Sequence, residues 1–389
     1  MDTVFVARRN SKTPGFNIAS IFDKKMVTGE VGLEIEVEGN KFPKNETIGS
    51  AIPLPWVYHK DGSLRGQDNA EYVLKAPIKF DAVPDAIKIL WDLFAAYGSK
   101  LDVSNRTSVH VHLNAQKFHL NRLAAFLGMY FSVEEMLTEW CGDHRVGNLF
   151  CLRAKDATAI VTHLKKFIQA DGSYELREGL HYAGLNAHAL YKFGSIEIRS
   201  LRGCTEPQTI LDWVAILRRI YEKSADFPDP RLIPDSLSSD GPMAYLDMVL
   251  GEHRSTVING IGWTIDKVRG SLYEGIRLAQ DICYCRDWSL YSPVEMKSDP
   301  FGRPAKKVAS SLSHLAQTLV QNQASFNMAN QIGDQIYQIN VSTPPPPTPV
   351  GWSLPHETID GEQVWVNEEV PEMEEGDEAE DMDGDEQAE

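Results

Sequence analysis

Polar and apolar side chains alternate with a period of two through residues 31–37, which is typical of a β-strand with one buried face. The apolar positions of this segment are Leu33, Ile35 and Val37. The opposite face carries the carboxylates Glu34 and Glu36, about 7 Å apart along the strand. Two negative charges this close together indicate that a positively charged group binds there.

The same alternation recurs in three later segments, each bounded by turn-forming residues and each predicted to be a strand. Residues 70–74 carry Glu71, residues 108–113 carry two histidines, and residues 195–199 carry a glutamate and an arginine. If these strands share a sheet, one face gathers Glu34, Glu36, Glu71, His110, Glu197 and Arg199. Carboxylates with an imidazole suit Mg²⁺ or Mn²⁺, whereas the thiolates that would favour Zn²⁺ are missing from this face.

Between the strands, apolar residues recur every three to four positions and predict helices over residues 81–97, 121–140 and 155–169. Residues 205–208, Thr-Glu-Pro-Gln, form a capping box that would open a further helix. Short turns join the paired strands, which favours an antiparallel sheet. We therefore expect an α+β fold with helices packed on the apolar back of the sheet.

Two residues outside the predicted strands have more than one interpretation. Asp61, in Asp61-Gly62-Ser63, is either a turn former, which we favour because Asp-Gly is common in turns, or a further site carboxylate. Arg145 lies in a polar loop and either reaches a phosphate group or forms a surface salt bridge.

Residues 226–240 are rich in proline, aspartate and serine and are predicted to be a boundary loop. Beyond it, residues 243–280 and 305–339 have helical patterns without a row of donor groups. They form either an accessory layer or a surface for a homo-oligomer or partner protein. The expected division is an irregular lead-in (1–27), a catalytic domain (28–225), a helical accessory region (226–341), and a proline-rich linker with an acidic tail (342–389).

The 389 residues, of which 42% are hydrophobic, are enough to bury a substantial core. No apolar run is long enough to span a membrane, and the first ten residues lack the apolar segment of a secretory signal. We therefore expect a soluble, cytoplasmic protein. The five cysteines form no disulfide framework or zinc motif, so we interpret them as reduced thiols that mostly pack in the interior.

The formal net charge of -17 is concentrated at the C-terminus, where residues 368–389 hold 13 acidic and no basic side chains. The rest of the chain has 42 acidic and 38 basic residues and is only mildly acidic. We expect the tail to be disordered and to repel nucleic acid, so nucleic acid is not an expected partner.

Five motifs occur in a fixed order within residues 28–222. They are Gly32-Leu33-Glu34-Ile35-Glu36, Asp61-Gly62-Ser63 followed by Glu71, Ser108-Val109-His110-Val111-His112, Tyr182-x-Gly184-Leu185-Asn186, and Ile196-Glu197-Ile198-Arg199. This series resembles the amidoligase family of the carboxylate-amine ligase superfamily. Glutamine synthetase and glutamate-cysteine ligase are relatives of that family, and many of its members occur in phages and bacteria.

The resemblance implies a curved antiparallel sheet, with helices on its convex face and with ATP and two or more Mg²⁺ or Mn²⁺ ions on its concave face. The metal ligands implied by motif position are Glu34, Glu36, Glu71, His110 and Glu197. His112 would lie beside the nucleotide, and Arg199 would contact the transferred phosphoryl group. The phosphate contact considered above for Arg145 would make it a further nucleotide-binding residue. Glu197 and Arg199 would then be the catalytic residues.

The reaction implied by the resemblance phosphorylates a small-molecule or peptide carboxylate with ATP, and an amine then attacks the acyl phosphate to form an amide. It would take place in the cytoplasm, or in the host cytoplasm if the protein is phage-encoded. Phosphoryl transfer depends mainly on positioning and charge neutralisation, which explains why carboxylate-held cations and an arginine are the required parts.

Two positions depart from the family's pattern. Ser108 stands where the family often has glycine, and Leu180-His181 replaces a common arginine. A second hypothesis is therefore a catalytically degenerate ligase fold that serves as a binding or assembly factor. A third is a metal-dependent hydrolase that uses His110, His112 and the carboxylates, although the helical ligand spacing usual for such enzymes is missing.

Deleting residues 342–389 should leave the fold and nucleotide binding unchanged, because this segment has too little apolar surface to offset its ordering entropy. Thermal unfolding of the full-length and truncated proteins would measure this. A large drop in melting temperature on deletion would show that the tail packs on the rest of the protein.

Overall fold

The computed structural model describes residues 17–44, 52–65, 68–176, 182–290, 358–359 and 362–363. The chain divides into two compact units, Met1–Phe301 and Gly302–Glu389. In the second unit, the described residues form the antiparallel pair β8 (Thr358–Ile359) and β9 (Glu362–Gln363), which precede the acidic tail expected to be disordered. The helix expected over residues 305–339 and the rest of the tail lie outside the described residues.

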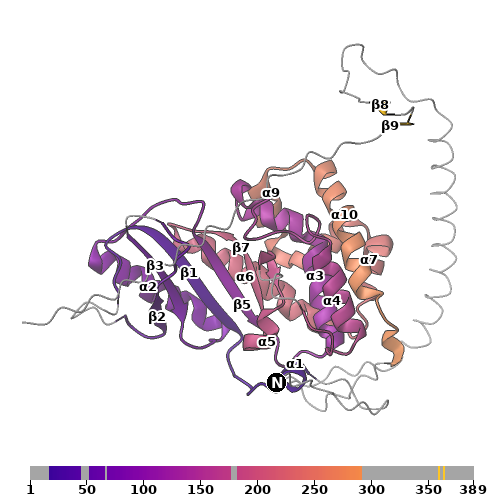
Figure 1. Cartoon of the computed structure of the whole chain (residues 1–389), viewed down its shortest axis with the longest axis horizontal. Helices are drawn as coiled ribbons and strands as arrows, with labels where there is room; N and C mark the ends of the chain where they lie inside the picture. The colour runs from indigo at the N-terminus through magenta and orange to yellow at the C-terminus, as the bar shows by residue number, and fades with distance from the viewer. Residues whose placement is uncertain are drawn as a thin grey trace, which may run out of the picture. The chain divides into compact units, whose positions relative to one another are not determined.

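The first unit is α+β, as expected, and is built on a seven-stranded antiparallel sheet (Figure 1). The strand order is β2-β3-β1-β5-β7-β6, with β4 paired to β1. The strands are β1 (Val31–Asn40), β2 (Trp56–His59), β3 (Asp68–Leu74), β4 (Lys100–Leu101), β5 (Ser108–Asn114), β6 (Leu185–Asn186) and β7 (Ser195–Arg202).

Helices pack on one face of this sheet and continue into a larger helical layer (Figure 1). The α-helices are α1 (Ile18–Ile21), α2 (Val83–Tyr97), α3 (Leu120–Trp140), α4 (Ala159–Gln169), α5 (Ala189–Phe193), α6 (Pro207–Lys223), α7 (Leu232–Asp240), α8 (Pro242–Leu250), α9 (Arg254–Ile261) and α10 (Ile265–Cys283). Short 3-10 turns are η1 (Phe80–Ala82), η2 (Asp143–Arg145), η4 (Ser224–Asp226), η5 (Gly251–His253) and η6 (Trp288–Leu290). None of the helices described here is long and apolar enough to cross a membrane.

The apolar faces predicted for the strands form the part of the core that lies against the helices. The buried strand residues include Leu33, Ile35, Val37, Val109, Val111, Ile196 and Ile198. Hydrogen bonds also connect sheet and helices. The Trp56 indole, for example, donates to the carbonyl of Ala86 in α2 at 2.7 Å, and the Tyr221 hydroxyl of α6 donates to the carbonyl of Asn114 at 2.9 Å. Burial of this face fixes the side of the sheet on which the polar residues emerge.

The prediction of a boundary loop over residues 226–240 is wrong, because nine of these residues form α7. Pro234 lies in the first turn of α7, where a missing N–H breaks no helical hydrogen bond, so the helix tolerates it. Farther along, α10 packs along α3 and buries Leu272 and Ile276 in the same core as the sheet. The expected division at residues 225–226 therefore falls inside one compact unit.

The capping box expected at residues 205–208 is also not formed. The N-cap of α6 is Glu206, which makes no side-chain cap hydrogen bond, and Gln208 donates to Asp212 at 2.8 Å instead. The expectation for the cysteines is confirmed: all five are free thiols, and Cys141, Cys151 and Cys283 are buried.

One acidic side chain, Glu134 of α3, is buried on the helical side of the sheet, with 3% of its surface exposed. Its Oε2 accepts a hydrogen bond from the main-chain N–H of Ala154 at 2.8 Å, and its Oε1 has no hydrogen-bond partner within the described ranges. Burial raises the pKa of Glu134 to about 8, although Arg153 and Lys155 oppose the shift. Glu134 therefore keeps its proton at neutral pH in the folded protein.

Replacing Glu134 by glutamine should remove a pH dependence of stability. Between pH 4.5 and about 8 the folded protein keeps a proton that the unfolded chain releases, so this group's contribution to stability falls as pH rises. The variant Glu134→Gln can still accept from Ala154 but has no proton to lose. Its free energy of unfolding, relative to the parent, should rise by up to about 1.4 kcal/mol per pH unit across that window.

Urea unfolding of the parent, Glu134→Gln and the control Glu139→Gln, from the same helix, at pH 5, 6.5 and 8 would measure this difference. A difference between parent and Glu134→Gln that stays constant with pH would contradict the assignment.

Candidate functional site

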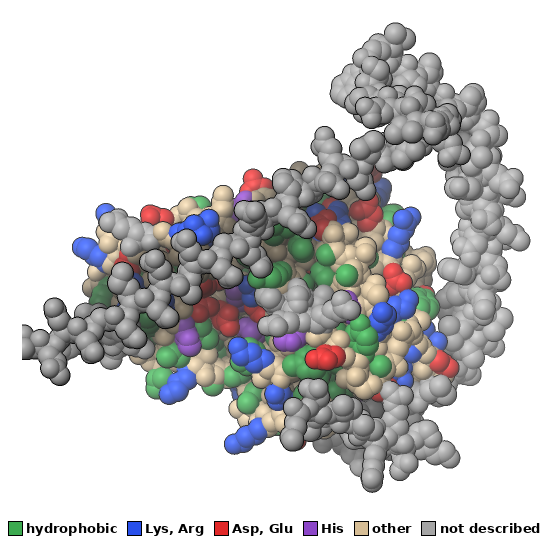
Figure 2. All heavy atoms as spheres, in the orientation of Figure 1, with side chains coloured by type: hydrophobic (Ala, Val, Ile, Leu, Met, Phe, Trp, Pro, Cys, Tyr) green, Lys and Arg blue, Asp and Glu red, His purple; other side chains and the backbone are tan. Residues whose placement is uncertain are grey.

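The sheet face opposite the apolar core carries acidic and histidine side chains from β1, β3, β5 and β7, and we call it the carboxylate face. The strand register brings these side chains together in three directly opposed pairs: Glu34 with His110, Glu36 with Glu71, and His112 with Glu197. Acidic side chains with histidines beside them gather over the sheet on the face turned to the viewer in Figure 2. Side chains that are far apart in the sequence thus become neighbours through strand pairing alone.

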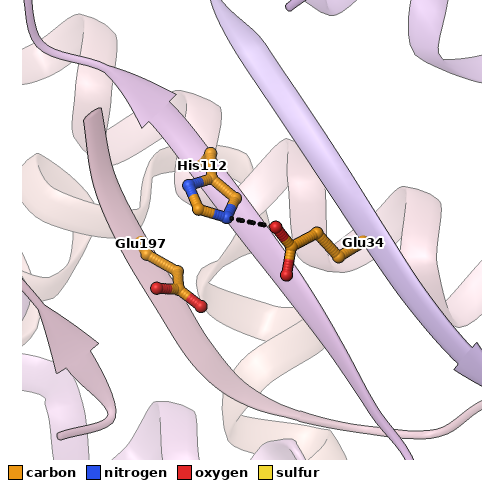
Figure 3. Close-up of side chains that lie close together, drawn as sticks. All are labelled: Glu34, His112 and Glu197. Carbon is orange, nitrogen blue, oxygen red and sulfur yellow. Dashed lines mark hydrogen bonds and ion pairs between the residues drawn. The ribbon is translucent and has the colours of Figure 1, made fainter. Parts of the chain in front are cut away.

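One group of possible ligands on this face consists of Glu34, His112 and Glu197, each of which offers an atom within 4.8 Å of the other two. Figure 3 shows the three side chains pointing toward one another from β1, β5 and β7. His112 Nε2 lies 3.0 Å from Glu34 Oε1. We call these residues the first donor group.

A second donor group consists of Glu36, Asp61 and Glu71, again with ligand atoms within 4.8 Å of one another. Glu36 and Glu71 are directly opposed across β1 and β3, where like charges repel. Burial, followed by the charges of Glu34, Glu36 and Asp61, raises the pKa of Glu71 to about 8. Without a bound cation, Glu71 therefore keeps its proton at neutral pH.

His110 lies between the two groups and is 4% exposed. Its Nδ1 is 3.0 Å from Glu34 Oε2 and 3.4 Å from Glu197 Oε1. Its other ring nitrogen, Nε2, is 2.8 Å from the Ser108 hydroxyl and 3.7 Å from Glu36 Oε1. One imidazole thus faces both donor groups, through different nitrogens.

The charges in the first donor group stabilise one another. Burial alone would raise the pKa of Glu34, but hydrogen bonds with His110 and His112 outweigh it and hold this pKa well below its usual range. Burial likewise opposes the shift of Glu197, whose pKa is lowered by His112, Arg199 and His110. Burial opposes the shift of His112 too, but Glu34 and Glu197 raise its pKa. The His112 imidazole thus stabilises the negative charge of both carboxylates, and a metal cation could take over this role.

The placement of Asp61 is compatible with both interpretations that the sequence left open. Its Oδ1 accepts a hydrogen bond from the main-chain N–H of Ser63 at 2.7 Å, which confirms the turn, and its carboxylate also belongs to the second donor group. The turn follows β2 and places Asp61 beside Glu71 on the neighbouring strand. The sequence analysis had favoured the turn role because Asp-Gly is common in turns.

The two arginines assigned to phosphate contacts lie in different environments. The Arg199 side chain is 20% exposed, and its Nη1 donates to Glu197 Oε1 at 2.6 Å, so these two residues form an ion pair. Arg145 is buried and does not join the donor groups. Its Nε and Nη2 donate to the main-chain carbonyls of Ser200 and Arg199 at 3.0 and 2.6 Å, which holds the guanidinium against β7 rather than among the donor groups.

Three polar residues that the sequence did not assign contact the donor groups. Asn186 Nδ2 donates to Glu197 Oε2 at 2.6 Å, Ser195 Oγ lies 3.2 Å from His112 Nδ1, and Ser108 contacts both Glu36 and His110. Asn186 ends a motif that the sequence had singled out, and each serine lies two residues before a site residue on its strand. The motif could therefore have predicted Asn186, and the strand period of two could have predicted both serines.

The chemistry of the donor groups fits a hard divalent cation. Carboxylate oxygens predominate, imidazole nitrogens are the minority, and neither group contains a thiolate. Mg²⁺ and Mn²⁺ prefer this mixture. The residues at positions 180 and 181, where the sequence departs from the family's pattern, lie outside the described residues.

Comparison of the sequence with protein-family models gives no match, and a search of curated proteins finds no significant relative. The resemblance to the amidoligase family therefore depends on the order of the motifs, and the geometry above is independent of it.

Replacing Asp61 by asparagine separates its turn role from its ligand role. Asparagine Oδ1 can still accept from Ser63, but the side chain loses its negative charge, so Mn²⁺ binding should weaken on the order of tenfold or more while the melting temperature of the cation-free protein changes little. Isothermal titration with Mn²⁺ would measure the affinity.

The matched control is Asp287→Asn, because Asp287 makes the same turn hydrogen bond, to the N–H of Ser289 at 3.0 Å, and is not part of either donor group. Equal Mn²⁺ affinities for the parent and Asp61→Asn would leave Asp61 as a turn residue only.

Proposed function

We propose that this protein is an ATP- and Mg²⁺- or Mn²⁺-dependent carboxylate-amine ligase that forms an amide through an acyl phosphate. The observation that supports this most directly is the placement of two donor groups on one face of an antiparallel sheet, joined by His110 and bordered by Arg199. An arrangement with two cation positions and an arginine is suited to phosphoryl transfer. The order of the sequence motifs points to the same chemistry.

In the proposed reaction, an oxygen of the substrate carboxylate attacks the γ-phosphorus of ATP, and the bond from that phosphorus to the β,γ-bridging oxygen breaks. ADP leaves, and the carboxylate has become an acyl phosphate. The amine nitrogen then attacks the acyl carbon, loses a proton, and expels inorganic phosphate to leave the amide. No step requires a nucleophile from the protein. The main requirement is therefore a set of carboxylates that hold the cations in place.

Glu34, Glu197 and the imidazole of His110 or His112 would hold one cation, and Glu36, Asp61 and Glu71 would hold a second. Mg²⁺ or Mn²⁺, when bound, neutralises the charge of the phosphate oxygens. The cation-free groups favour such binding, because Glu36 and Glu71 oppose each other with no basic side chain between them in strand register. The proposal also includes the finer features implied by the resemblance: a curved sheet, with ATP on its concave face.

Arg199 would contact the transferring phosphoryl group. Its present bonds to Glu197 and, at 3.5 Å, to the carbonyl of Phe150 hold the guanidinium at the edge of the donor groups. Further N–H groups of the same fork can grip phosphate oxygens, because a guanidinium presents several donors in one plane. Glu197 would then hold a cation and orient Arg199.

Two observations favour a second candidate, in which the ligase fold is catalytically degenerate and serves as a binding or assembly factor. The Arg199 guanidinium is already paired with Glu197, and Ser108 occupies a position where the resembled family often has glycine. In this candidate the carboxylate face would bind cations for stability alone.

Release of ADP from ATP separates the two candidates. The ligase should release ADP only with Mg²⁺ or Mn²⁺ and a carboxylate substrate present, and an added amine should stimulate it. Screening amino acids and peptides, each with ammonia or a primary amine, would search for both substrates. Cation binding without amine-stimulated ADP release across the screen would favour the degenerate candidate.

Replacing Arg199 by lysine should lower turnover on the order of 10²-fold while leaving the fold and most ATP binding intact. Lysine keeps the charge but loses the planar fork, and the lost contact strengthens as charge builds on the transferring group. The measurement is kcat together with the Kd for ATP.

The control is Arg202→Lys, because Arg202 is on the same strand but donates to the carbonyls of Trp140 and Cys141. If Arg199 only pairs with Glu197, an ammonium can replace it, and a rate within about threefold of the parent would rule out the phosphoryl contact.

A further inference from the structure

Ser108, the first residue of β5, connects the two donor groups and is 5% exposed. Its main-chain N–H and its hydroxyl are each 2.7 Å from Glu36 Oε2, and the same hydroxyl is 2.8 Å from His110 Nε2. Glu36 belongs to the second donor group, and His110 Nδ1 faces Glu34 and Glu197 of the first. A single buried hydroxyl therefore contacts Glu36 of the second donor group and His110, which faces the first.

The direction of these hydrogen bonds follows from what each group can donate. A carboxylate accepts only, a hydroxyl donates once and also accepts, and a neutral imidazole carries its proton on one nitrogen. If His110 Nδ1 binds a cation, its ring proton must be on Nε2, where it needs an acceptor. Ser108 Oγ can accept a hydrogen bond from His110 Nε2–H, and its own O–H can donate to Glu36 Oε2. Each of these polar groups then has a hydrogen-bond partner.

We infer that Ser108 is a positioning residue that couples the two cation positions, an inference that rests on the proposed function. Its hydroxyl holds His110 with Nδ1 toward Glu34 and Glu197. By occupying Glu36 Oε2, it leaves Glu36 Oε1 for the second group. The residue that departs from the family's pattern thereby has a function of its own in this chain, because glycine at position 108 would provide the N–H contact but no hydroxyl.

No other group in the cluster replaces that hydroxyl for His110. The nearest carboxylate oxygen to Nε2 is Glu36 Oε1 at 3.7 Å, which is too long for a hydrogen bond. His110 is buried, so water does not readily replace the lost contact. Removing the hydroxyl should therefore let the imidazole ring turn or place its proton on Nδ1, and both changes weaken cation binding.

Titration of the full-length protein with Mn²⁺, followed by electron paramagnetic resonance of the free ion, tests the coupling. Ser108→Ala and Ser108→Gly should weaken Mn²⁺ binding by about 10- to 100-fold, as the loss of an outer-shell partner does at other metal sites, whereas Ser108→Thr keeps a hydroxyl and should restore most of the affinity. The control is Ser200→Ala on β7, a buried strand serine whose hydroxyl contacts Tyr130 of α3 at 3.3 Å instead.

A second readout is the position of the His110 ring proton, measured by ¹⁵N NMR of the imidazole in the Mg²⁺-loaded protein. The parent and Ser108→Thr should show a single form with the proton on Nε2. In Ser108→Ala that form should be lost or mixed with the other. Circular dichroism and melting temperature of each variant identify those that fold.

The outcomes separate this inference from the proposed function. Equal Mn²⁺ affinities for the parent and Ser108→Ala, or a parent His110 whose proton stays on Nδ1 with Mg²⁺ bound, would overturn the role of Ser108 while leaving the ligase proposal in place. A parent that binds no Mn²⁺ would overturn both. If neither Ser108→Ala nor Ser108→Gly folds, the parent spectrum alone decides.

Discussion

Mutual repulsion of carboxylates is the constraint on which the carboxylate face depends. Glu36 and Glu71 oppose each other across neighbouring strands, and Glu34, Glu197 and Asp61 lie close by. These strands cannot move apart or shift in register, because their other face is buried against helices, and a one-residue slip would turn the glutamates into the core. Hydrophobic burial on one side of the sheet thus holds like charges together on the other, where only protons or cations can relieve the repulsion.

The two donor groups relieve this repulsion in different ways. In the first, contacts with His110 and His112 lower the pKa values of Glu34 and Glu197, and in the second, Glu71 keeps a proton. Ser108 and His110 form the contact between the groups. A cation in either position would therefore displace protons from a network that reaches the other, which is the physical basis for treating the face as one site rather than two.

The sequence predicted what depends on local alternation, and failed where a residue's role depends on its neighbours in space. The four polar strands and the apolar backs of β1, β5 and β7 follow from a period of two. Composition does not show burial, so Arg145 was left with two interpretations and the loop predicted for residues 226–240 was wrong. Arg145 is buried beneath β7, and α7 is stabilised by packing of Ile233 and Leu237. For Asp61, turn preference and cation binding favour the same residue type, so only strand pairing reveals that its carboxylate lies beside Glu36 and Glu71.

The most direct test of the central claim is a crystal structure of the protein with Mn²⁺ and a non-hydrolysable ATP analogue, with anomalous scattering recorded at the manganese edge. We predict two anomalous peaks about 3.5–4 Å apart, one bound by Glu34, Glu197 and an imidazole and the other by Glu36, Asp61 and Glu71, each at about 2.0–2.6 Å. A carboxylate face without anomalous density, or manganese bound elsewhere on the protein, would contradict it.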